Sequence, residues 1–416
     1  MIHSNLIRED IKMALETVRT HKVRSFLTVL GVVIGTMVAI VVASILLGVE
    51  KNVQDTLNEF GVDNLFIFKF DPGFHFGRLS PEERTRKSLT YEDGMTIKEE
   101  LPAVKNVVVE ALPHIGEGNQ PIRTARNKSH ELTNIIFRGV TSSYAEVVNG
   151  KMKEGRFFTD QEDLHREEVV VIGFDAEKSL FPEETAEGKQ LMVDGNLYKI
   201  IGVFQKKKNS VGNAGDNEVL IPYRTYHKHY PQDDENFVIA MAQPGMKNVA
   251  EDEVRGLLRL RRRVPPNKPD NFGISSAEAL GNQFRDIMAG IFQLVVGIVS
   301  IGLLVGGVGV MNIMLMSVTE RTREIGIRKA IGARKRDISF QFITEAMTLT
   351  GIGGIMGVVL SLVASFLMQL AHFPSSVPVW AIVLAVAVAS SVGLFFGIYP
   401  AVKAARLDPV IALRYE

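Results

Sequence analysis

Three long stretches of the sequence contain no Asp, Glu, Lys or Arg: residues 25–49, 287–319 and 346–402. A helix needs about 20 consecutive apolar residues to cross the hydrocarbon core of a bilayer, so each stretch can hold at least one span. Pro374 and Pro378 divide the last stretch. The sequence therefore predicts four transmembrane helices, at 25–48, 286–316, 346–371 and 380–402, with a short outer turn at 372–379.

The second stretch is too long for one upright span. Thirty-odd helical residues extend roughly 50 Å, whereas the hydrocarbon core is about 30 Å thick. Ser275-Ser276-Ala277-Glu278, just upstream, fits a capping box at a helix N-terminus. The sequence predicts that one helix begins near residue 276, projects from the membrane as a stalk and continues through it.

The composition excludes several functional classes. The chain has 47 basic and 47 acidic residues, whereas a nucleic-acid binder is expected to carry a basic excess. It has no cysteine, which rules out disulfides, thiolate metal sites and cysteine nucleophiles. The cores of the spans contain no acid or base, and ion-coupled carriers usually need intramembrane carboxylates or histidines as relays. These observations argue against a proton- or sodium-driven carrier.

Basic residues set the expected orientation. They are concentrated in residues 1–24, in 317–345 and in the tail at 403–416, whereas the 372–379 turn has none. The positive-inside rule places both termini and the 317–345 segment in the cytoplasm, with residues 49–285 on the other side of the membrane. Trp380 begins the fourth span at the expected outer interface.

Residues 1–24 form the leader of the first span. Apolar residues repeat along one helical face, at Ile7, Ile11 and Val18, which predicts an amphipathic helix on the inner leaflet. Two interpretations stay open: a simple anchor, or a contact for a cytoplasmic partner. The leader is polar and no small-residue cleavage site follows the span, which is typical of an uncleaved anchor rather than a signal peptide.

The region outside the membrane reads as α+β. Residues of about 50–117 and 231–275 alternate strand and helix patterns, which indicates a split βαβ unit built from both ends of the region. Residues of about 118–230 form an inserted β-rich part, with a hairpin turn at Asp194-Gly195. Gly, Asn and Lys residues predict a mobile loop at 206–216.

No catalytic motif is present in the sequence. It lacks the G-x-x-x-x-G-K-[ST] phosphate loop, the H-E-x-x-H zinc motif and the G-x-S-x-G nucleophile elbow. His227 and His229 are spaced for two metal ligands, but no third ligand is evident, so a Tyr-rich surface turn is the favoured interpretation. A membrane enzyme is therefore a poorly supported alternative.

Small residues at four-residue spacing recur in every predicted span. Such pairs let helix backbones approach closely, which predicts tight helix packing or dimerisation. The pairs are Gly31 and Gly35, Gly302 and Gly306, Gly353 and Gly357, and Gly393 and Gly397.

The segment "SVTERTREIGIRKAIGARKRDI" (317–338) follows the second span and carries seven Lys or Arg. Read as a helix, it places Ile327, Ile331 and Ile338 on one face with Ala330 beside them. Gly326 and Gly332 permit bends, so one or two short amphipathic helices are expected. A topological anchor needs only basic residues. The apolar face and the acids Glu320 and Glu324 instead indicate a protein-contacting surface.

The stretch "LLVGGVGVMNIMLMSVTERTREIGIRKAIGARKRDI" (303–338) closely resembles the permease signature of MacB-type ABC transporters, within the wider FtsX/LolC-like permease family. Similar stretches cover nearly the whole chain. "RSFLTVLGVVIGTMVAIVV" (24–42) resembles the first span of the family, and "GIYPAVKAARLDPVIALRYE" (397–416) its C-terminus. "VVVIGFDAEKSLFPEETAEGKQLMVDGNLYKIIGVFQKK" (169–207) is similar to its periplasmic core domain.

The resemblance implies a dimer, homodimeric or with a similar permease, driven by a cytoplasmic P-loop ATPase pair. ATP and Mg²⁺ would be held by the ATPase, with no cofactor on this chain and no nucleic acid or metal, and membrane lipid would surround the spans. The ATPases would push on the loop after the second span, which moves the outer domain without passing substrate through the bilayer (mechanotransmission). Carried over by position, the ATPase-coupling residues are Glu320, Arg321, Arg323, Glu324, Gly326, Arg328, Lys329, Gly332 and Ala333.

One departure concerns the ATPase. MacB-type proteins carry it at the N-terminus of the same chain, whereas only about 24 residues precede the first span here, so a separate ATPase polypeptide is expected. The chain would then be a non-catalytic permease subunit for efflux or export, working with a periplasmic adaptor and an outer-membrane duct. The alternatives are an FtsX-like regulator that signals to a cell-wall hydrolase or sensor, and a lipoprotein-extraction subunit.

Overall fold

The computed structural model describes residues 22–59, 61–70, 83, 85–113, 123–128, 130–206, 216–371, 373 and 375–413. Residues 1–21 of the predicted leader helix and residues 207–215 of the predicted loop lie outside this part of the chain. The chain forms two compact units: a helical unit of residues 1–49 and 287–416, and an α/β unit of residues 50–286. Each unit is described by itself below.

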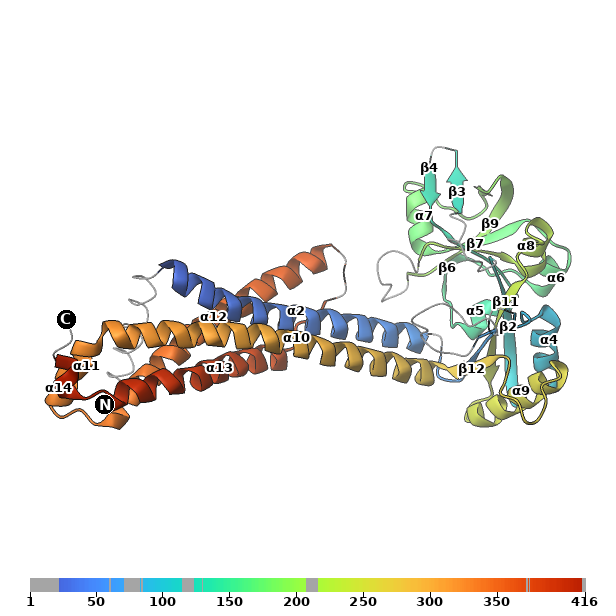
Figure 1. Cartoon of the computed structure of the whole chain (residues 1–416). Coiled ribbons are helices and arrows are strands. Elements are labelled where there is room, and N and C mark those ends of the chain that lie inside the picture. Colours follow the sequence, from blue (N-terminus) through green and yellow to red (C-terminus); the bar gives the residue numbers. More distant parts are fainter. Residues whose placement is uncertain are drawn as a thin grey trace. The chain divides into compact units, whose positions relative to one another are not determined.

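Four long helices build the helical unit (Figure 1). They are α2 (Lys22–Glu59), α10 (Ala277–Glu320), α12 (Lys335–Leu370) and α13 (Val379–Arg406). Each is long and apolar enough to cross a membrane, which confirms the four predicted spans. Two short helices, α11 (Thr322–Ala330) and α14 (Pro409–Leu413), follow α10 and α13 respectively. Helix α2 is longer than predicted, because it continues past the apolar stretch to Glu59.

Helix α10 is one continuous helix of 44 residues. At 1.5 Å per residue it is about 66 Å long, roughly twice the hydrocarbon thickness, which confirms the predicted overlong helix. The predicted capping box needs correction. Ser276 is the capping residue, since its Oγ accepts a hydrogen bond from the amide of Ala279. Glu278, the expected second member of the box, instead pairs with Lys247 at 3.1 Å.

The described strands of the α/β unit form one twelve-stranded sheet, in the order β12-β1-β11-β2-β5-β10-β7-β9-β8-β3-β4 with β6 paired to β9. Its first four members are β12 (Gly273–Ser276), β1 (Asn64–Phe68), β11 (Glu235–Ala242) and β2 (Val104–Leu112). Both β1 and β2 are antiparallel to β11, which lies between them, and α4 (Tyr91–Glu100) connects them. Likewise α9 (Lys247–Arg261) connects β11 to β12, with β1 between. These are two interlocked split βαβ units, whereas the sequence predicted one such unit built from both ends of the region.

The remaining strands and four short helices make up the inserted part. The strands are β3 (Thr124–Asn127), β4 (His130–Thr133), β5 (Ile136–Val140), β6 (Met152–Gly155), β7 (Val169–Ile172), β8 (Gln190–Val193), β9 (Asn196–Phe204) and β10 (Glu218–Pro222). The helices are α5 (Tyr144–Val147), α6 (Asp160–Leu164), α7 (Phe174–Leu180) and α8 (Tyr223–His229). Asp194 and Gly195 both have positive φ, +47° and +87°, at the β8–β9 turn, which confirms the predicted hairpin.

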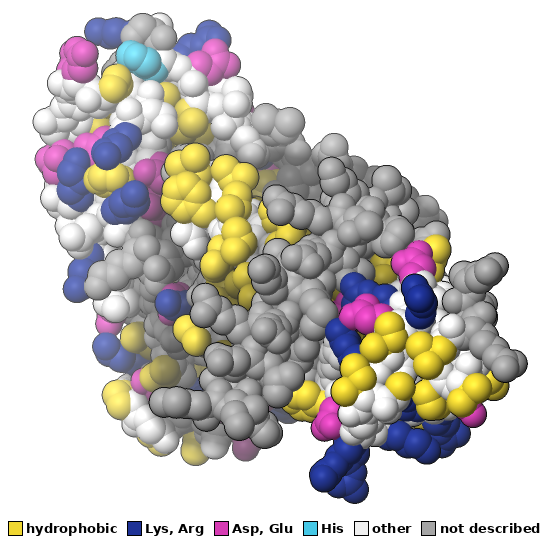
Figure 2. Space-filling model, turned by 90° about the vertical axis from the view of Figure 1, so that its left-hand side faces the viewer, with side chains coloured by type: hydrophobic (Ala, Val, Ile, Leu, Met, Phe, Trp, Pro, Cys, Tyr) yellow, Lys and Arg dark blue, Asp and Glu magenta, His cyan; other side chains and the backbone are white. Residues whose placement is uncertain are grey.

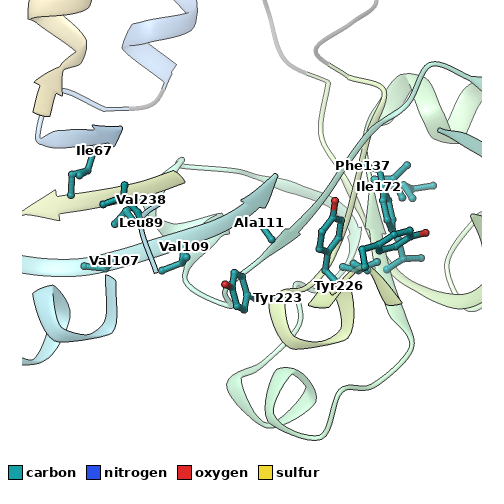
Figure 3. Close-up of a cluster of buried hydrophobic side chains, with 14 of the residues drawn as sticks. Ile67, Leu89, Val107, Val109, Ala111, Phe137, Ile172, Tyr223, Tyr226 and Val238 are labelled. Carbon is teal, nitrogen blue, oxygen red and sulfur yellow. The ribbon is translucent and has the colours of Figure 1, made fainter. Parts of the chain in front are cut away.

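The sheet buries apolar side chains on both faces. Along β2, Val107 and Val109 belong to one cluster, and Val108 between them belongs to the other, as the two-residue period of a strand requires. The first cluster runs without a break from the split βαβ units into the inserted part. Figure 3 shows it from Ile67 and Val238 to Phe137 and its aromatic neighbours. The two parts therefore share one core.

A buried ion cluster lies where the two parts join. Arg138 of β5 donates to Glu110 of β2 at 2.9 Å and to Glu218 of β10 at 3.2 Å. Burial alone would lower the pKa of Arg138, but the two carboxylates outweigh it and raise this pKa. The β2–β5 pairing itself covers only two residue pairs. The arginine therefore bridges a junction that has few backbone hydrogen bonds of its own.

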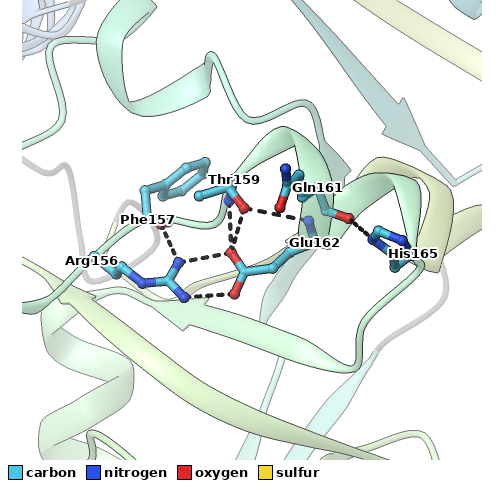
Figure 4. A network of polar contacts seen from close by, with 6 residues as sticks. All are labelled: Arg156, Phe157, Thr159, Gln161, Glu162 and His165. Carbon is cyan, nitrogen blue, oxygen red and sulfur yellow. Dashed lines mark hydrogen bonds and ion pairs between the residues drawn. The ribbon is translucent and has the colours of Figure 1, made fainter.

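A second polar network caps α6. Glu162 accepts two hydrogen bonds from Arg156, each of 2.7 Å, and one from the Thr159 amide at 2.8 Å (Figure 4). The Thr159 side chain accepts in return from the Glu162 amide, which completes a capping box. The Arg156 contact and the Thr159 amide together lower the pKa of Glu162 to about 2.

Candidate functional site

The segment after α10 folds as a short helix set off by two breaks. Helix α10 ends at Glu320, and Arg321 alone separates it from α11. Thr322 begins α11 and turns its Oγ1 back to the Val318 carbonyl, 3.0 Å away. After α11, Gly332 takes φ +106°, a conformation that favours glycine, and α12 begins at Lys335. The bend expected at Gly332 is thus present, whereas Gly326 lies inside α11 and the other break falls at Arg321. The segment contains one short helix followed by the start of a long one.

The apolar face of this segment differs from the prediction. Ile325 is the isoleucine of α11 that is buried, at 1% exposure. Ile338 is also buried, but it belongs to α12. Ile327 and Ile331 are 42% and 81% exposed. The single-face prediction was wrong because the turn at Gly332 ends α11, so residues on either side of that turn do not share one helical axis.

Ile325 joins a core at this end of the helical unit. The cluster collects Val310, Met314 and Val318 of α10, Ile338, Phe342 and Ala346 of α12, and Ala401, Ala404 and Ala405 of α13. Ala333 packs against its margin. Helix α11 is therefore seated on three of the long helices.

The C-terminal helix α14 packs directly on α11. A Cβ placed on Gly326 would lie 2.7 Å from the Cβ of Ala412, so only glycine allows this approach. Lys329 donates to the carbonyl of Leu407, just before α14, at 2.6 Å. Partial burial lowers the pKa of Lys329, and nearby Lys335 acts in the same direction. Two of the predicted coupling residues, Gly326 and Lys329, thus hold α14 in place.

Other predicted coupling residues bind α12. Arg321 lies 3.5 Å from Glu345. Arg328 donates to Gln341 of α12 at 2.8 Å and to Glu324 one turn earlier in α11 at 2.5 Å. Sequence reasoning missed Glu345, although its position directly before the third charge-free stretch is an unusual place for an acid. It also missed the α14 contacts, for which the Asp408-Pro409 pair was the available helix-start signal.

The outward side of this end carries apolar and charged groups together. Ile327 of α11 and Ile331, the residue directly after α11, are exposed, as are Val410, Ile411 and Leu413 of α14. Figure 2 faces this end and shows, at its lower right, hydrophobic side chains gathered between Lys and Arg side chains. The exposed charges of the segment are Glu320, Arg323, Glu324, Arg334, Lys335, Arg336, Asp337, Lys403, Arg406 and Asp408. We call the five apolar residues and these charges the α11/α14 surface.

The predicted packing glycines lie between helices of one chain, with one exception. A Cβ on Gly31 would lie 3.0 Å from the Cα of Gly306, where α2 crosses α10, and Gly35 faces Leu303. Gly353 and Gly357 of α12 face α2, and Gly393 and Gly397 of α13 face Ala346 of α12. Gly302 has no heavy atom within 4 Å of such a Cβ in the described structure. Seven of the eight glycines thus lie at contacts between helices of the same chain. Dimerisation through these glycines stays a prediction.

Two histidines considered as metal ligands point to different partners. Nε2 of His227 lies 2.9 Å from the Tyr223 hydroxyl, and Nε2 of His229 lies 3.0 Å from the Glu168 carboxylate. Both are on α8 rather than in the surface turn that was expected. Burial lowers the pKa of His227. Among the described residues no cluster of three His, Asp or Glu side chains could hold a metal ion.

The α/β unit contains an open cavity of about 1030 Å³ beside this helix. Tyr91 and Tyr223, with ring centroids 4.8 Å apart, line it together with several cations. Three of those cations have partners within the chain: Lys69 with Glu235, Lys228 with Glu168 and Arg224 with Asp163. The cavity is therefore an open groove in which these three cations are already paired within the chain.

Comparison with known proteins places the chain in a family. The sequence profile of the MacB-like periplasmic core domain matches residues 25–257, and that of the FtsX-like permease C-terminal domain matches residues 296–409. The fold and the matches define a multi-pass membrane protein of the permease class. The chain belongs to the MacB-like family, with an FtsX-like permease region at its C-terminal end.

Several curated relatives share this organisation. The chain is 34% identical to the macrolide export ATP-binding/permease protein MacB of Wolinella succinogenes, over 100% of this chain and 62% of that protein. It is 32% identical to the pyoverdine export ATP-binding/permease protein PvdT of Pseudomonas aeruginosa, over 97% of this chain and 58% of that protein. The chain thus spans about three fifths of the length of these relatives.

Two solved structures are similar to the α/β part. The periplasmic region of MacB from Actinobacillus actinomycetemcomitans has 18% identity and a TM-score of 0.43, covering 56% of this chain and 97% of that one. The extracellular domain of the ABC-type transporter YknZ from Gram-positive bacteria has 20% identity and a TM-score of 0.39, covering 51% and 100%.

Proposed function

We propose that this chain is the permease part of an ABC transporter, in which an ATP-binding partner acts on α11 and the charged residues beside it. ATP hydrolysis by that partner is coupled to conformational work of the α/β unit outside the membrane, and the work serves export. The observation that carries the proposal is the pairing of an exposed α11, braced to α10, α12 and α13, with a continuous α10 of 44 residues.

The geometry supports transmission rather than passage of a solute. Helix α11 follows α10 after a single residue, so motion of α11 acts on the end of a helix about 66 Å long. The charge-free stretches of the sequence offer no relay for coupled ions. The partner would supply ATP and Mg²⁺ binding, and this chain would supply the surface that the partner moves.

Orientation and partners are part of the proposal. Both termini and α11 face the cytoplasm, because Lys and Arg are concentrated in these segments. The α/β unit then lies on the outer side of the inner membrane. The chain works as a homodimer or with a similar permease. In a cell with two membranes, the α/β unit contacts a periplasmic adaptor that leads to an outer-membrane duct. The relatives named for macrolide and pyoverdine export support an exported small molecule.

The orientation can be tested with single cysteines, because the native chain has none. Leu260→Cys in the α/β unit and Ile331→Cys directly after α11 both replace exposed side chains. A membrane-impermeant maleimide should label Leu260→Cys in intact spheroplasts and Ile331→Cys only after the membrane is opened. Equal labelling of both before opening would contradict the orientation.

The coupling can be tested by reconstitution. The tagged full chain is purified with each ABC-type ATPase subunit of its own genome and placed in lipid nanodiscs. One ATPase should be retained, and its hydrolysis rate should depend on the permease. Retention of none, with the chain folded and inserted, would contradict a separate ATPase; hydrolysis that the permease leaves unchanged would contradict coupling.

The FtsX-like match over residues 296–409 favours a second function, ATP-driven signalling to a cell-wall hydrolase without transport. The two functions differ in their products. Vesicles that contain the full complex should export a labelled substrate under the first. Under the second they should activate a hydrolase and move nothing.

A further inference from the structure

The C-terminal helix α14 is built to present its apolar side chains outward. Of its five residues, Ala412 is buried against Gly326. Val410 and Ile411 are 63% and 66% exposed, and Leu413 is also exposed. The helix is nevertheless held firmly: the Asp408 carboxylate accepts from the Val410 amide at 2.8 Å, and Lys329 fixes the carbonyl of Leu407. A short helix that is fixed on one side and exposes apolar side chains on the other is suited to binding another molecule.

The exposed faces of α11 and α14 form one surface. Gly326 and Ala412 bring the two backbones together, and the outward residues Ile327 of α11 and Ile331 directly after it lie on the same two-helix unit as those of α14. Burial of such side chains contributes roughly 1.5–3 kcal/mol each when they are fully covered. A partner that binds one helix of the pair therefore gains additional binding free energy by also burying the exposed side chains of the other.

The charges around this surface favour a protein over a lipid headgroup layer. An anionic leaflet attracts Lys and Arg and repels acids. Here the exposed acids Glu320, Glu324 and Asp408 stand among the basic residues. Exposed bases still outnumber exposed acids, six to four. A protein groove with an apolar floor and a mainly acidic rim complements this arrangement, because it can pair both signs locally.

From these contacts we infer that α14 is the second half of the docking surface for the ATP-binding partner, and that Ile411 and Val410 enter the same apolar groove of that partner as Ile331 directly after α11. This inference rests on the proposed function and adds to it a segment that lies about 80 residues further along the chain than α11. The relatives are consistent with such a partner, since their printed names include ATP binding and they extend beyond the matched region.

The test uses the full chain in nanodiscs of phosphatidylethanolamine and phosphatidylglycerol, with the ATPase that wild type retains. Ile411→Glu and Ile331→Glu place a charge on each half of the surface. Leu260→Glu, an equally exposed apolar site in the α/β unit, is the matched control. Each of the first two changes should weaken retention of the ATPase by about tenfold or more, as for a buried apolar anchor. The control should bind as wild type does.

A second measurement keeps the inference testable when a variant folds poorly. Ile411→Cys is the only thiol in the chain. Its maleimide labelling should be rapid in nanodiscs alone and slowed about tenfold by the ATPase, because a bound partner excludes the reagent. Labelling of Leu260→Cys should not change.

The other possible outcomes distinguish a failure of this inference from a failure of the proposed function. Loss of binding with Ile331→Glu but not with Ile411→Glu, and no protection of Ile411→Cys, would overturn the role of α14 and leave the proposed function standing. Protection of Ile411→Cys without ATPase would assign the surface to the bilayer. A disulfide between two chains through Ile411→Cys would assign it to a second copy. Failure of wild type to retain any ATPase would count against the proposed function first.

Discussion

Arg321 and Glu345 form an ion pair across a helix junction: Nη1 of the arginine lies 3.5 Å from Oε1 of the glutamate, whose side chain is 2% exposed. Arg321 is the single residue between α10 and α11, and Glu345 lies on α12. The pair therefore links the point at which α10 can bend to a neighbouring long helix. Because Glu345 is buried, removal of Arg321 takes a compensating cation away from a carboxylate that water does not reach.

Breaking this pair should destabilise the junction. Arg321→Gln leaves the buried Glu345 carboxylate without its cation, so we expect a loss of roughly 1–3 kcal/mol, below the range for fully buried pairs because Arg321 is partly exposed. The double variant Arg321→Gln/Glu345→Gln should recover part of that loss. Thermal melting of the four members of the cycle in detergent gives the coupling. Additive effects would show that the two side chains do not interact.

The packing glycines should differ in their tolerance of a methyl group. A Cβ on Gly357 would meet the side chain of Thr36 and lie 2.9 Å from the Val33 carbonyl. Gly357→Ala should therefore lower the stability of the full chain by about 1–3 kcal/mol, as overpacking does. Gly302→Ala is the matched control, since no heavy atom of the described structure lies within 4 Å of the new methyl group. Equal melting temperatures for the two variants would contradict the described helix packing.

The contact of Gly326 with Ala412 predicts a compensating exchange. Gly326→Ala should displace α14 and reduce the ATPase stimulation that the permease gives, because two methyl groups cannot occupy one gap. Adding Ala412→Gly moves the single methyl group to the other helix and should restore much of that stimulation. Ala412→Gly alone should have a small effect. A double variant as impaired as Gly326→Ala would show that Gly326 is needed for another reason.

The Glu162 network should make acid stability depend on one carboxylate. Its pKa is lowered from 4.5 to about 2 by Arg156 and the Thr159 amide. A depressed carboxylate stabilises the fold above its unfolded pKa, and this contribution disappears as the pH falls through the folded value. Wild type should therefore lose stability more steeply than Glu162→Gln between about pH 4.5 and 2. Melting temperatures across this range check it, with the exposed Glu183→Gln as control.

Arg138 should be essential to the join within the α/β unit. Its replacement by Met leaves two acids, Glu110 and Glu218, buried at 1% and 5% exposure. We expect a loss of roughly 3–5 kcal/mol, because an uncompensated buried charge is strongly destabilising. The triple variant Glu110→Gln/Arg138→Met/Glu218→Gln removes the charges together and should melt closer to wild type. A benign single variant would contradict a structural role for the cluster.

Local patterns predicted the secondary structure well where one physical cause was dominant. Asp194 and Gly195 form the turn between β8 and β9 with positive φ at both residues, as their turn chemistry predicted. The three charge-free stretches, the last divided by Pro374 and Pro378, fold into four long helices because a membrane requires apolar length. A split βαβ unit also followed from strands and helices alternating at both ends of the region, but the second, interlocked unit was not predicted.

The α11/α14 surface was only partly predictable. The sequence indicated that residues 320–333 carry it, but a helical wheel drawn through Gly332 placed Ile327 and Ile338 on one face. The fold separates them, because the positive φ of Gly332 starts a new helix axis. The α14 contribution depends on Gly326 meeting Ala412, a contact between residues 86 positions apart. Local periodicity has no information about such a pair.

The way the inserted part enters the sheet has a consequence for how proteins of this kind can diverge. Leu112 ends β2 and Glu235 begins β11, and the two are paired neighbours in the antiparallel ladder. The inserted segment between them, which contains strands β3 to β10, therefore leaves the four-stranded part of the sheet and rejoins it at one place. A lineage could shorten, exchange or lose that segment and close the gap with a tight hairpin, while the four-stranded remainder keeps its pairing. Such a change would also have to replace the core that the two parts share and the Arg138 cluster at their junction.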